Sequence, residues 1–214
     1  MGAESMVMKE IICEVSQLFP FQLAFHTNRQ AKDYSLNNAP IIVGNGFEND
    51  NYIFNKNVDG PLGWAGRIAP EKGLEDAVKI ASDLEEKLLV WGVIDDKEYA
   101  KKIENTFKKD IIEWKGFLPT NKFQEQLGEC RAFINTPKWN EAYGNVIVEA
   151  MACGVPVIAY DLGGPGELIK DGLNGFLVQP NDIEGMIKAI KSVSKIKRKN
   201  CRDWFERNAS SNIF

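Results

Sequence analysis

Two glutamates eight positions apart mark the most chemically informative part of the sequence. Glu141 and Glu149 lie in the segment NEAYGNVIVEAMACGVPVIA, with Gly144 and Asn145 between them. The segment is typical of a loop, a helix start and then a buried strand, so the loop and the helix each present one carboxylate. Free amides at a helix start attract phosphate, and carboxylates accept hydrogen bonds from sugar hydroxyls. The pattern therefore predicts a ligand that is part phosphate and part sugar.

A second segment, GRIAPEKGLEDA, contributes two cations, Arg67 and Lys72. Together the two segments resemble the donor-binding motifs of the retaining glycosyltransferases with the two-lobed GT-B fold, family 4. Three fainter similarities are GNGFEND, WKGFLP and GGPGELIKDGLNGFLV. All five occur in the expected order between residues 39 and 190. The resemblance therefore implies the donor-binding, C-terminal lobe of such an enzyme.

The resemblance also implies a role for each matching residue. Arg67 and Lys72 would contact the donor diphosphate. Glu141 would face the donor sugar, and Glu149 would hold the ribose hydroxyls. The other expected donor-binding residues, two in a base-binding turn and five around the helix start, are Phe117, Leu118, Ala142, Tyr143, Gly144, Asn145 and Val146. In the family no protein nucleophile is firmly established, so Arg67, Lys72 and Glu141 are the expected catalytic residues.

Glycosyl transfer leaves negative charge on the departing phosphate, and something must stabilise that charge. Many transferases use a metal held by an Asp-x-Asp pair, and this sequence contains none. Arg67, Lys72 and the amides near Gly144 can serve instead, since preorganised positive groups stabilise developing charge. We therefore predict no metal, no cofactor and donor binding that is independent of metal ions.

Plainer interpretations of the same residues stay open. Arg67 can be a surface salt-bridge partner. Lys72, expected in the first turn of a helix, can be a solvated cation, although cations are disfavoured there. The two glutamates can be capping acids, and Asn145 can cap the helix. Phe117 can be ordinary core packing.

The hydrophobic pattern predicts strands that alternate with helices, which is typical of a Rossmann-like parallel sheet covered by helices on both faces. Ligands bind such sheets beyond the carboxyl ends of the strands. The expected strands are residues 40–43, 62–66, 87–93, 110–114, 131–135, 155–160 and 176–178, and the first of them is expected to be buried. The expected helices are residues 71–84, 95–109, 121–130, 166–170 and 182–196.

The two ends resemble remnants of the other lobe. Residues 1–38 match the end of the N-terminal acceptor lobe, residues 39–196 the nucleotide-sugar-binding domain, and residues 197–214 the crossover helix of the family. The N-terminal lobe is then largely missing, so Trp204 and Phe205 are expected to be exposed and to favour self-association. The sole histidine, His26, follows a strand predicted at residues 21–25 and can face the cleft between lobes.

Composition narrows the remaining possibilities. The net charge of −4 does not favour nucleic-acid binding, and no apolar run is long enough to span a bilayer. The four cysteines have no metal-ligand spacing, which indicates reduced thiols and a cytoplasmic location. The basic run of Lys195, Lys197, Arg198 and Lys199 is expected to be a solvated helix end, with contact to a membrane surface as the weaker alternative.

The best prediction is transfer of a hexose from a nucleotide sugar, UDP-glucose by preference, to an unknown acceptor. A glycoside hydrolase would also use two carboxylates but would not need Arg67 and Lys72. A non-catalytic nucleotide-sugar-binding module is the main alternative. A dehydrogenase is disfavoured because no G-x-G-x-x-G follows a strand.

Overall fold

The computed structural model describes residues 6–56, 59–108 and 110–213. Its centre is a six-stranded sheet in the order β5-β4-β3-β6-β7-β8, in which every neighbouring pair is parallel. The strands are β3 (Leu62–Ala65), β4 (Leu88–Trp91), β5 (Ile112–Gly116), β6 (Ala132–Asn135), β7 (Val157–Tyr160) and β8 (Gly175–Val178). The predicted alternation of strands and helices is therefore confirmed.

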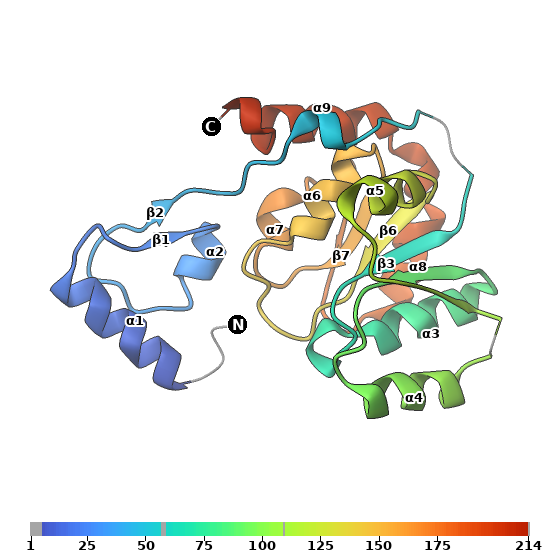
Figure 1. Ribbon diagram of the computed structural model, residues 1–214, viewed down its shortest axis with the longest axis horizontal. Coiled ribbons are helices and arrows are strands. Elements are labelled where there is room, and N and C mark those ends of the chain that lie inside the picture. The colour runs from blue at the N-terminus through green and yellow to red at the C-terminus, as the bar shows by residue number, and fades with distance from the viewer. Residues whose placement is uncertain (1–5, 57–58, 109, 214) are drawn as a thin grey trace.

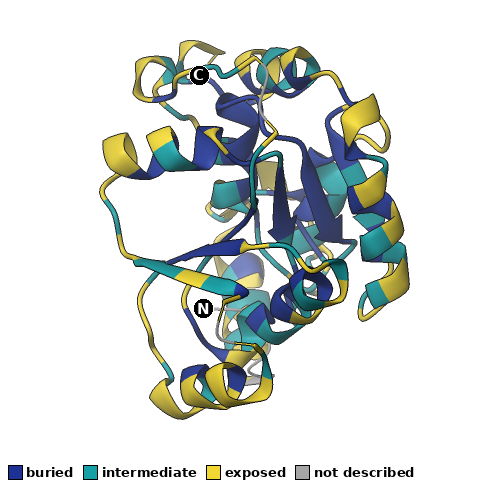
Figure 2. Cartoon of the chain, turned by 90° about the vertical axis from the view of Figure 1, so that its right-hand side faces the viewer, coloured by how far each residue is buried: buried dark blue, intermediate teal, exposed yellow. Residues whose placement is uncertain are grey.

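Helices cover both faces of this sheet (Figures 1 and 2). One face packs against α3 (Leu74–Leu84), α4 (Lys97–Thr106) and α8 (Ile183–Lys191), and the other against α5 (Thr120–Gly128), α6 (Asn145–Ala152) and α9 (Arg198–Asn208). Successive strand residues serve opposite cores: Leu88 and Val90 face the first group of helices, while Leu89 and Trp91 face the second. Because the strands are buried on both sides, they are continuously apolar.

The strand order reverses between β3 and β6. From β3 the chain builds outward through β4 and β5, then returns to the other side of β3 to form β6, β7 and β8. The loops after β3 and β6 therefore diverge at the carboxyl edge of the sheet, which is where such folds bind ligands.

The N-terminal segment lies beside the sheet rather than in it (Figure 1). It contains α1 (Met6–Leu18), β1 (Ala24–Phe25), α2 (Asn28–Ala31) and β2 (Ile41–Ile42), and β1 pairs with β2 in a separate two-stranded parallel sheet. The expectation of a buried strand at residues 40–43 was wrong, because Ile41 and Ile42 are 40% and 38% exposed. No helix covers the exposed side of these two residues among the described elements.

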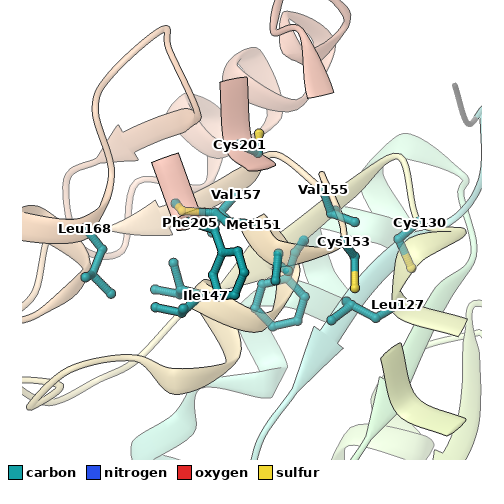
Figure 3. Close-up of a cluster of buried hydrophobic side chains, with 14 of the residues drawn as sticks. Leu127, Cys130, Ile147, Met151, Cys153, Val155, Val157, Leu168, Cys201 and Phe205 are labelled. Carbon is teal, nitrogen blue, oxygen red and sulfur yellow. The ribbon is translucent and has the colours of Figure 1, made fainter. Parts of the chain in front are cut away.

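The C-terminal helix α9 packs on α6. The expectation that Trp204 and Phe205 are exposed was wrong: Phe205 is fully buried in the core cluster of Figure 3, and Trp204 packs partly buried against it. Phe205 contacts Tyr52 edge-on, with ring centroids 5.9 Å apart. Helix α9 therefore completes the core of this lobe and leaves no aromatic patch for self-association at these two positions.

Arg198, at the start of α9, also departs from expectation. It was expected to be part of a solvated basic run, yet its side chain is buried and donates to the carbonyl oxygens of Asn55, Gly128, Cys130 and Cys153. Its guanidinium joins three separate backbone segments, so this arginine is a structural residue. Neighbouring Lys197 and Lys199 are exposed as expected.

No helix in the described part of the chain is both long and apolar enough to cross a membrane. Cys130, Cys153 and Cys201 are buried free thiols, and Cys153 is the core residue that its apolar surroundings predict (Figure 3). Burial raises the pKa of all three thiols to about 12, so they stay protonated and unreactive at neutral pH.

Candidate active site

The loop that carries Glu141 follows β6 and is held from behind by a second loop. The backbone of Glu141 forms a parallel bridge with Gly163, and its carbonyl accepts a 2.6 Å hydrogen bond from Gly164 N–H. Gly163 has φ +69°, and a Cβ there would lie 2.3 Å from the Glu141 carbonyl oxygen. The glycine-rich segment GGPGEL thus fixes the backbone that presents this carboxylate.

Helix α6 begins directly after this loop. Gly144 occupies the N-cap position with φ +104°, a left-handed conformation that favours glycine. The expectation that Asn145 caps the helix was wrong: it is the first helical residue, and its Oδ1 accepts a 2.8 Å hydrogen bond from Asn45 Nδ2. The amides of Asn145 and Val146 have no partner inside the helix by its geometry, so they are available to an anion.

Lys72 reaches Glu141 from the loop after β3. It ends the short 3-10 helix η2 (Pro70–Lys72) before α3 begins, so its expected place in the first turn of a helix was wrong. Its Nζ donates to Glu141 Oε2 at 2.6 Å and lies 4.7 Å from the centre of the Trp139 ring. Both charged side chains are mostly buried, at 19% and 16% exposure.

Two hydrogen bonds join the loops that hold this pair. Lys138 N–H donates to Glu71 O at 2.9 Å, and the buried Thr136 hydroxyl donates to Gly73 O at 2.8 Å. The loops after the two central strands are therefore one connected unit, and the Lys72–Glu141 pair is built on it.

A cavity of about 320 Å³ surrounds the pair. Its walls come from the ends of β3 and β6, from the Glu141 loop and from the N-terminal segment. The lining residues are His26, Asn45, Trp64, Ala65, Gly66, Lys72, Asn135, Glu141, Ala142, Tyr143, Gly144, Asn145 and Val146. The wall combines apolar surface with the polar side chains of His26, Lys72 and Glu141 and of three asparagines, which can bond a ligand with many hydroxyl groups.

A second cavity, of about 550 Å³, adjoins the first. Both are lined by Ala65, Gly66 and Val146, so they meet at the end of β3 and the start of α6. The other lining residues of the second cavity are Arg67, Trp91, Gly92, Val93, Phe117, Leu118, Pro119, Thr120, Phe123 and Glu149. The structure thus gathers the predicted site residues into two chambers with a shared boundary.

Arg67 and Phe117 are both exposed on the wall of this second cavity. Arg67 makes 2.6 Å ion pairs with Glu71 and Asp95, and its side chain is 52% exposed. Phe117 is 74% exposed, so the core-packing interpretation was wrong for it, whereas Leu118 packs against the core. An exposed ring beside an arginine offers a stacking surface and a charge to a ligand.

Glu149 lies on the inner wall of the second cavity. Tyr52 donates from its hydroxyl to Glu149 Oε1 at 3.1 Å. Burial raises the pKa of this carboxyl from 4.5 to about 6, and the Tyr52 hydrogen bond acts in the opposite direction. Glu141 and Glu149 line different chambers, and Glu141 is already paired with Lys72. This arrangement does not resemble the pair of carboxylates that flanks a single bond in a glycoside hydrolase.

The sequence interpretation missed several residues that the fold brings to these cavities. Asn45 and Trp64 lie on the wall of the first cavity, and so does Asn135, whose buried Oδ1 has no hydrogen-bond partner among the described residues. Tyr52 lies behind the second. Trp64 and Asn135 lie in strands that the pattern predicted, and Asn45 lies in the GNGFEND similarity, but none of these patterns marked the residues as part of a site.

The sequence interpretation allowed His26 to face a cleft, and in the structure it lies at the wall of a cavity. Its ring lines the first cavity, and its Nδ1 lies 2.9 Å from Gly44 O. A carbonyl oxygen only accepts, so Nδ1 carries the hydrogen and Nε2 of the neutral ring is an acceptor. Thr27, next in the chain, donates from its hydroxyl to Ala142 O at 2.9 Å and so ties this segment to the Glu141 loop.

Within the described residues, no group of three or more His, Cys, Asp or Glu side chains has an arrangement that could hold a metal ion. The positive groups at the cavities are Arg67, Lys72 and the first amides of α6.

Comparisons with known proteins identify the family. Residues 55–211 match the family model described as glycosyl transferases group 1. An uncharacterized glycosyltransferase of Methanocaldococcus jannaschii is 33% identical over 172 residues, which cover 78% of this chain and 48% of that protein. Sucrose synthase 5 of Oryza sativa subsp. japonica is 33% identical over 160 residues, which cover 66% of this chain and 17% of that protein.

The fold has a solved counterpart. The crystal structure of Anabaena Alr3699/HepE in complex with UDP and glucose matches with a TM-score of 0.84 at 18% identity, over 95% of this chain and 63% of that one. The chain thus spans about half the length of the archaeal relative and under two thirds of this structural neighbour. Because the family model matches most of the chain and the fold agrees with it, the chain belongs to the glycosyl transferases group 1 family, in which it corresponds to the C-terminal lobe of the GT-B fold.

Proposed function

We propose that this chain binds a nucleotide sugar and provides the donor site of a glycosyltransferase that retains anomeric configuration. The observation that carries the proposal is the pair of adjoining cavities that meet at Gly66 and Val146. A nucleotide sugar has a base and a ribose at one end, a hexose at the other and a diphosphate between them. The second cavity suits the base and the ribose, and the first cavity suits the hexose.

Each chamber supplies the groups that its part of the donor needs. Phe117 offers its exposed ring to the base, and Glu149 accepts hydrogen bonds from the ribose hydroxyls. The diphosphate lies at the boundary, where Arg67 and the amides of α6 face it and Lys72 approaches from the sugar side. Glu141 accepts hydrogen bonds from sugar hydroxyls while it stays paired with Lys72.

During transfer the bond from the sugar to the diphosphate breaks, and negative charge grows on the leaving phosphate. Arg67, Lys72 and the amides of Asn145 and Val146 stabilise that charge, each contributing about 1–4 kcal/mol in proportion to its proximity. The partners of Arg67 are exposed carboxylates, so exchanging them for phosphate costs little. Glu141 orients the sugar, and the leaving phosphate takes the proton of the attacking hydroxyl.

UDP-glucose is the proposed donor. Sucrose synthases are among the relatives, and the structural neighbour was solved with UDP and glucose. These similarities support a uridine nucleotide and a hexose but concern other proteins. A cytoplasmic location stays a prediction of the sequence.

Calorimetry tests the proposal directly. UDP-, GDP- and ADP-glucose are titrated into the chain, with and without EDTA. UDP-glucose should bind most tightly, and chelation should leave its affinity unchanged because the positive groups belong to the protein. If GDP- or ADP-glucose binds more tightly than UDP-glucose, that nucleotide sugar is the proposed donor instead. If EDTA abolishes binding and Mg²⁺ or Mn²⁺ restores it, the site depends on a metal ion and the prediction of metal independence is wrong. If none of the three nucleotide sugars binds, the proposed function is overturned.

A further inference from the structure

Tyr52 stands apart from the donor-contacting residues, yet it contacts one of them. It is 7% exposed, lies outside the lining of both cavities, and donates its hydroxyl to Glu149 Oε1 at 3.1 Å. Burial and the adjacent Glu149 carboxylate raise the pKa of Tyr52, so its phenol keeps the hydrogen that it donates. Glu149 Oε2 accepts no hydrogen bond from the described residues and remains for a ligand.

The position of Tyr52 is fixed from the side opposite Glu149. The ring of Phe205 on α9 meets the Tyr52 ring edge-on at 5.9 Å, and Phe47 meets it at 6.4 Å. Arg202, also on α9, donates to Tyr52 O and to Ala152 O at 2.8 Å each. Two segments far apart in sequence therefore hold the phenol in place.

Further backbone contacts make this support continuous with the end of the chain. Phe47 N–H donates to Ala209 O, and Ser211 N–H donates to Phe47 O, both at 2.8 Å. The segment before Tyr52 thus runs alongside the residues that follow α9. Movement of α9 would shift Tyr52 and, through it, the carboxylate of Glu149.

We propose that Tyr52 is a positioning residue for nucleotide binding: anchored by α9, it holds Oε1 of Glu149 so that this carboxylate presents its remaining acceptor positions to the ribose diol. The inference rests on the proposed function, since it takes Glu149 as the ribose acceptor. Each carboxylate oxygen accepts two hydrogen bonds, so one bond from Tyr52 leaves room for both ribose hydroxyls. The hydrogen bond also favours the ionised carboxylate, which is the better acceptor.

Other charged or titratable groups near Glu149 do not replace this contact. Arg67 lines the same cavity but is paired with Glu71 and Asp95. Cys153 lies one turn further along α6 and keeps its proton because of burial. Arg202 of α9 donates to backbone carbonyls and to Asn49 and Glu206. Among the described residues, Tyr52 is therefore the one that donates a hydrogen bond to this carboxylate and opposes the effect of its burial.

Tyr52→Phe removes the hydroxyl and keeps the ring packing. The carboxyl resonance of Glu149, followed by ¹³C NMR between pH 4 and 9 without ligand, should titrate at a higher pH in the variant than in the wild type. UDP affinity, measured by calorimetry, should fall about five- to tenfold at pH 6.5 and less at pH 8, where Glu149 is ionised in both proteins. An unchanged Glu149 titration would overturn the inference.

The ligand supplies a control that does not depend on the stability of the variant. 2′,3′-dideoxy-UDP lacks both ribose hydroxyls, so wild type and Tyr52→Phe should bind it equally. Equal weakening of UDP and its dideoxy analogue would assign Tyr52 a purely structural role. Adding Tyr52→Phe to Glu149→Gln should cost no further affinity, because the two changes act through one contact.

A matched protein control is Tyr99→Phe. Tyr99 also donates its hydroxyl to a glutamate, Glu75, but on the opposite face of the sheet. This change should leave UDP affinity and its pH dependence unaltered. If the wild type binds no UDP at any pH, the proposed function fails, whereas the ligand-free Glu149 titration still decides whether Tyr52 controls that carboxylate.

Discussion

The ammonium nitrogen of Lys72 lies 2.6 Å from Oε2 of Glu141, although 69 residues separate the two in the sequence. The pair neutralises two mostly buried charges at the place where a sugar meets its diphosphate in the proposed complex. Its consequence is that the lysine and the glutamate cannot be changed independently, because each removal leaves the other charge without its partner.

Glu141→Gln should distinguish the contribution of the sugar to binding from that of the nucleotide. The variant loses an ionised acceptor for sugar hydroxyls but frees Lys72 for phosphate. UDP-glucose affinity should therefore fall by about 1–2 kcal/mol, while UDP affinity stays the same or rises. Calorimetry with both ligands measures the difference. An equal loss for UDP and UDP-glucose would contradict the placement of Glu141 beside the sugar.

Arg67→Ala should weaken UDP binding by about 2–3 kcal/mol, the scale of a charged hydrogen bond. Its ion pairs are exposed and contribute little stability, so Tm should change by no more than a few degrees. Lys79→Ala is a matched control, since Lys79 is also 52% exposed and pairs with Asp83 on α3 away from the cavities. A large drop in Tm with unchanged UDP binding would make Arg67 a structural partner.

Two substitutions at His26 distinguish its ring nitrogens. The amide nitrogen of Asn can replace Nδ1 as the donor to Gly44 O, whereas the longer side chain of Gln can bring its amide oxygen to the place of Nε2 as an acceptor. His26→Asn should weaken UDP-glucose binding about fivefold and leave UDP binding unchanged, because His26 lines the cavity that we assign to the hexose and the variant lacks an acceptor in place of Nε2. His26→Gln should retain more of the UDP-glucose affinity. The opposite order would assign the contribution of His26 to its contact with Gly44.

Glu149 should give the free energy of unfolding a distinct pH dependence. Its pKa is raised from 4.5 to about 6 by burial, so the folded protein binds more protons than the unfolded chain between these values. Stability from this group therefore falls by about 2 kcal/mol as pH rises from 4.5 to above 6. Denaturant unfolding across pH 4–8 should show this slope in the wild type and lose it in Glu149→Gln. Glu184→Gln, at an exposed position on α8, should leave the slope unchanged.

Arg198→Met should destabilise the protein by about 3 kcal/mol or more. The change leaves four buried carbonyl oxygens without their donor, and each unsatisfied group carries a desolvation cost. Lys197→Met, one residue earlier and exposed, should change stability by less than about 0.5 kcal/mol. Chemical denaturation compares the two variants. Similar small effects would mean that water replaces the guanidinium.

The sequence by itself determined the layered α/β architecture and the composition of the donor motifs. Strand and helix periodicity depend on neighbouring residues, so the elements from β3 to β8 were predictable within a few residues. Glu141 and Glu149 were identifiable because local spacing places one in a loop and the other in the following helix. Arg67 and Lys72 were identifiable because a strand end lies just before them.

Only the tertiary structure decided which distant groups share a contact. Whether Phe205 is exposed depends on what α9 packs against, and α9 meets α6 rather than solvent. In the sequence Arg198 looks like one more basic surface residue, but in the structure three chain segments converge on it. Tyr52 reaches Glu149 across 97 positions. Such contacts depend on how whole elements pack, because the free energy of burying a charge or a ring is set by its surroundings and not by its sequence neighbours.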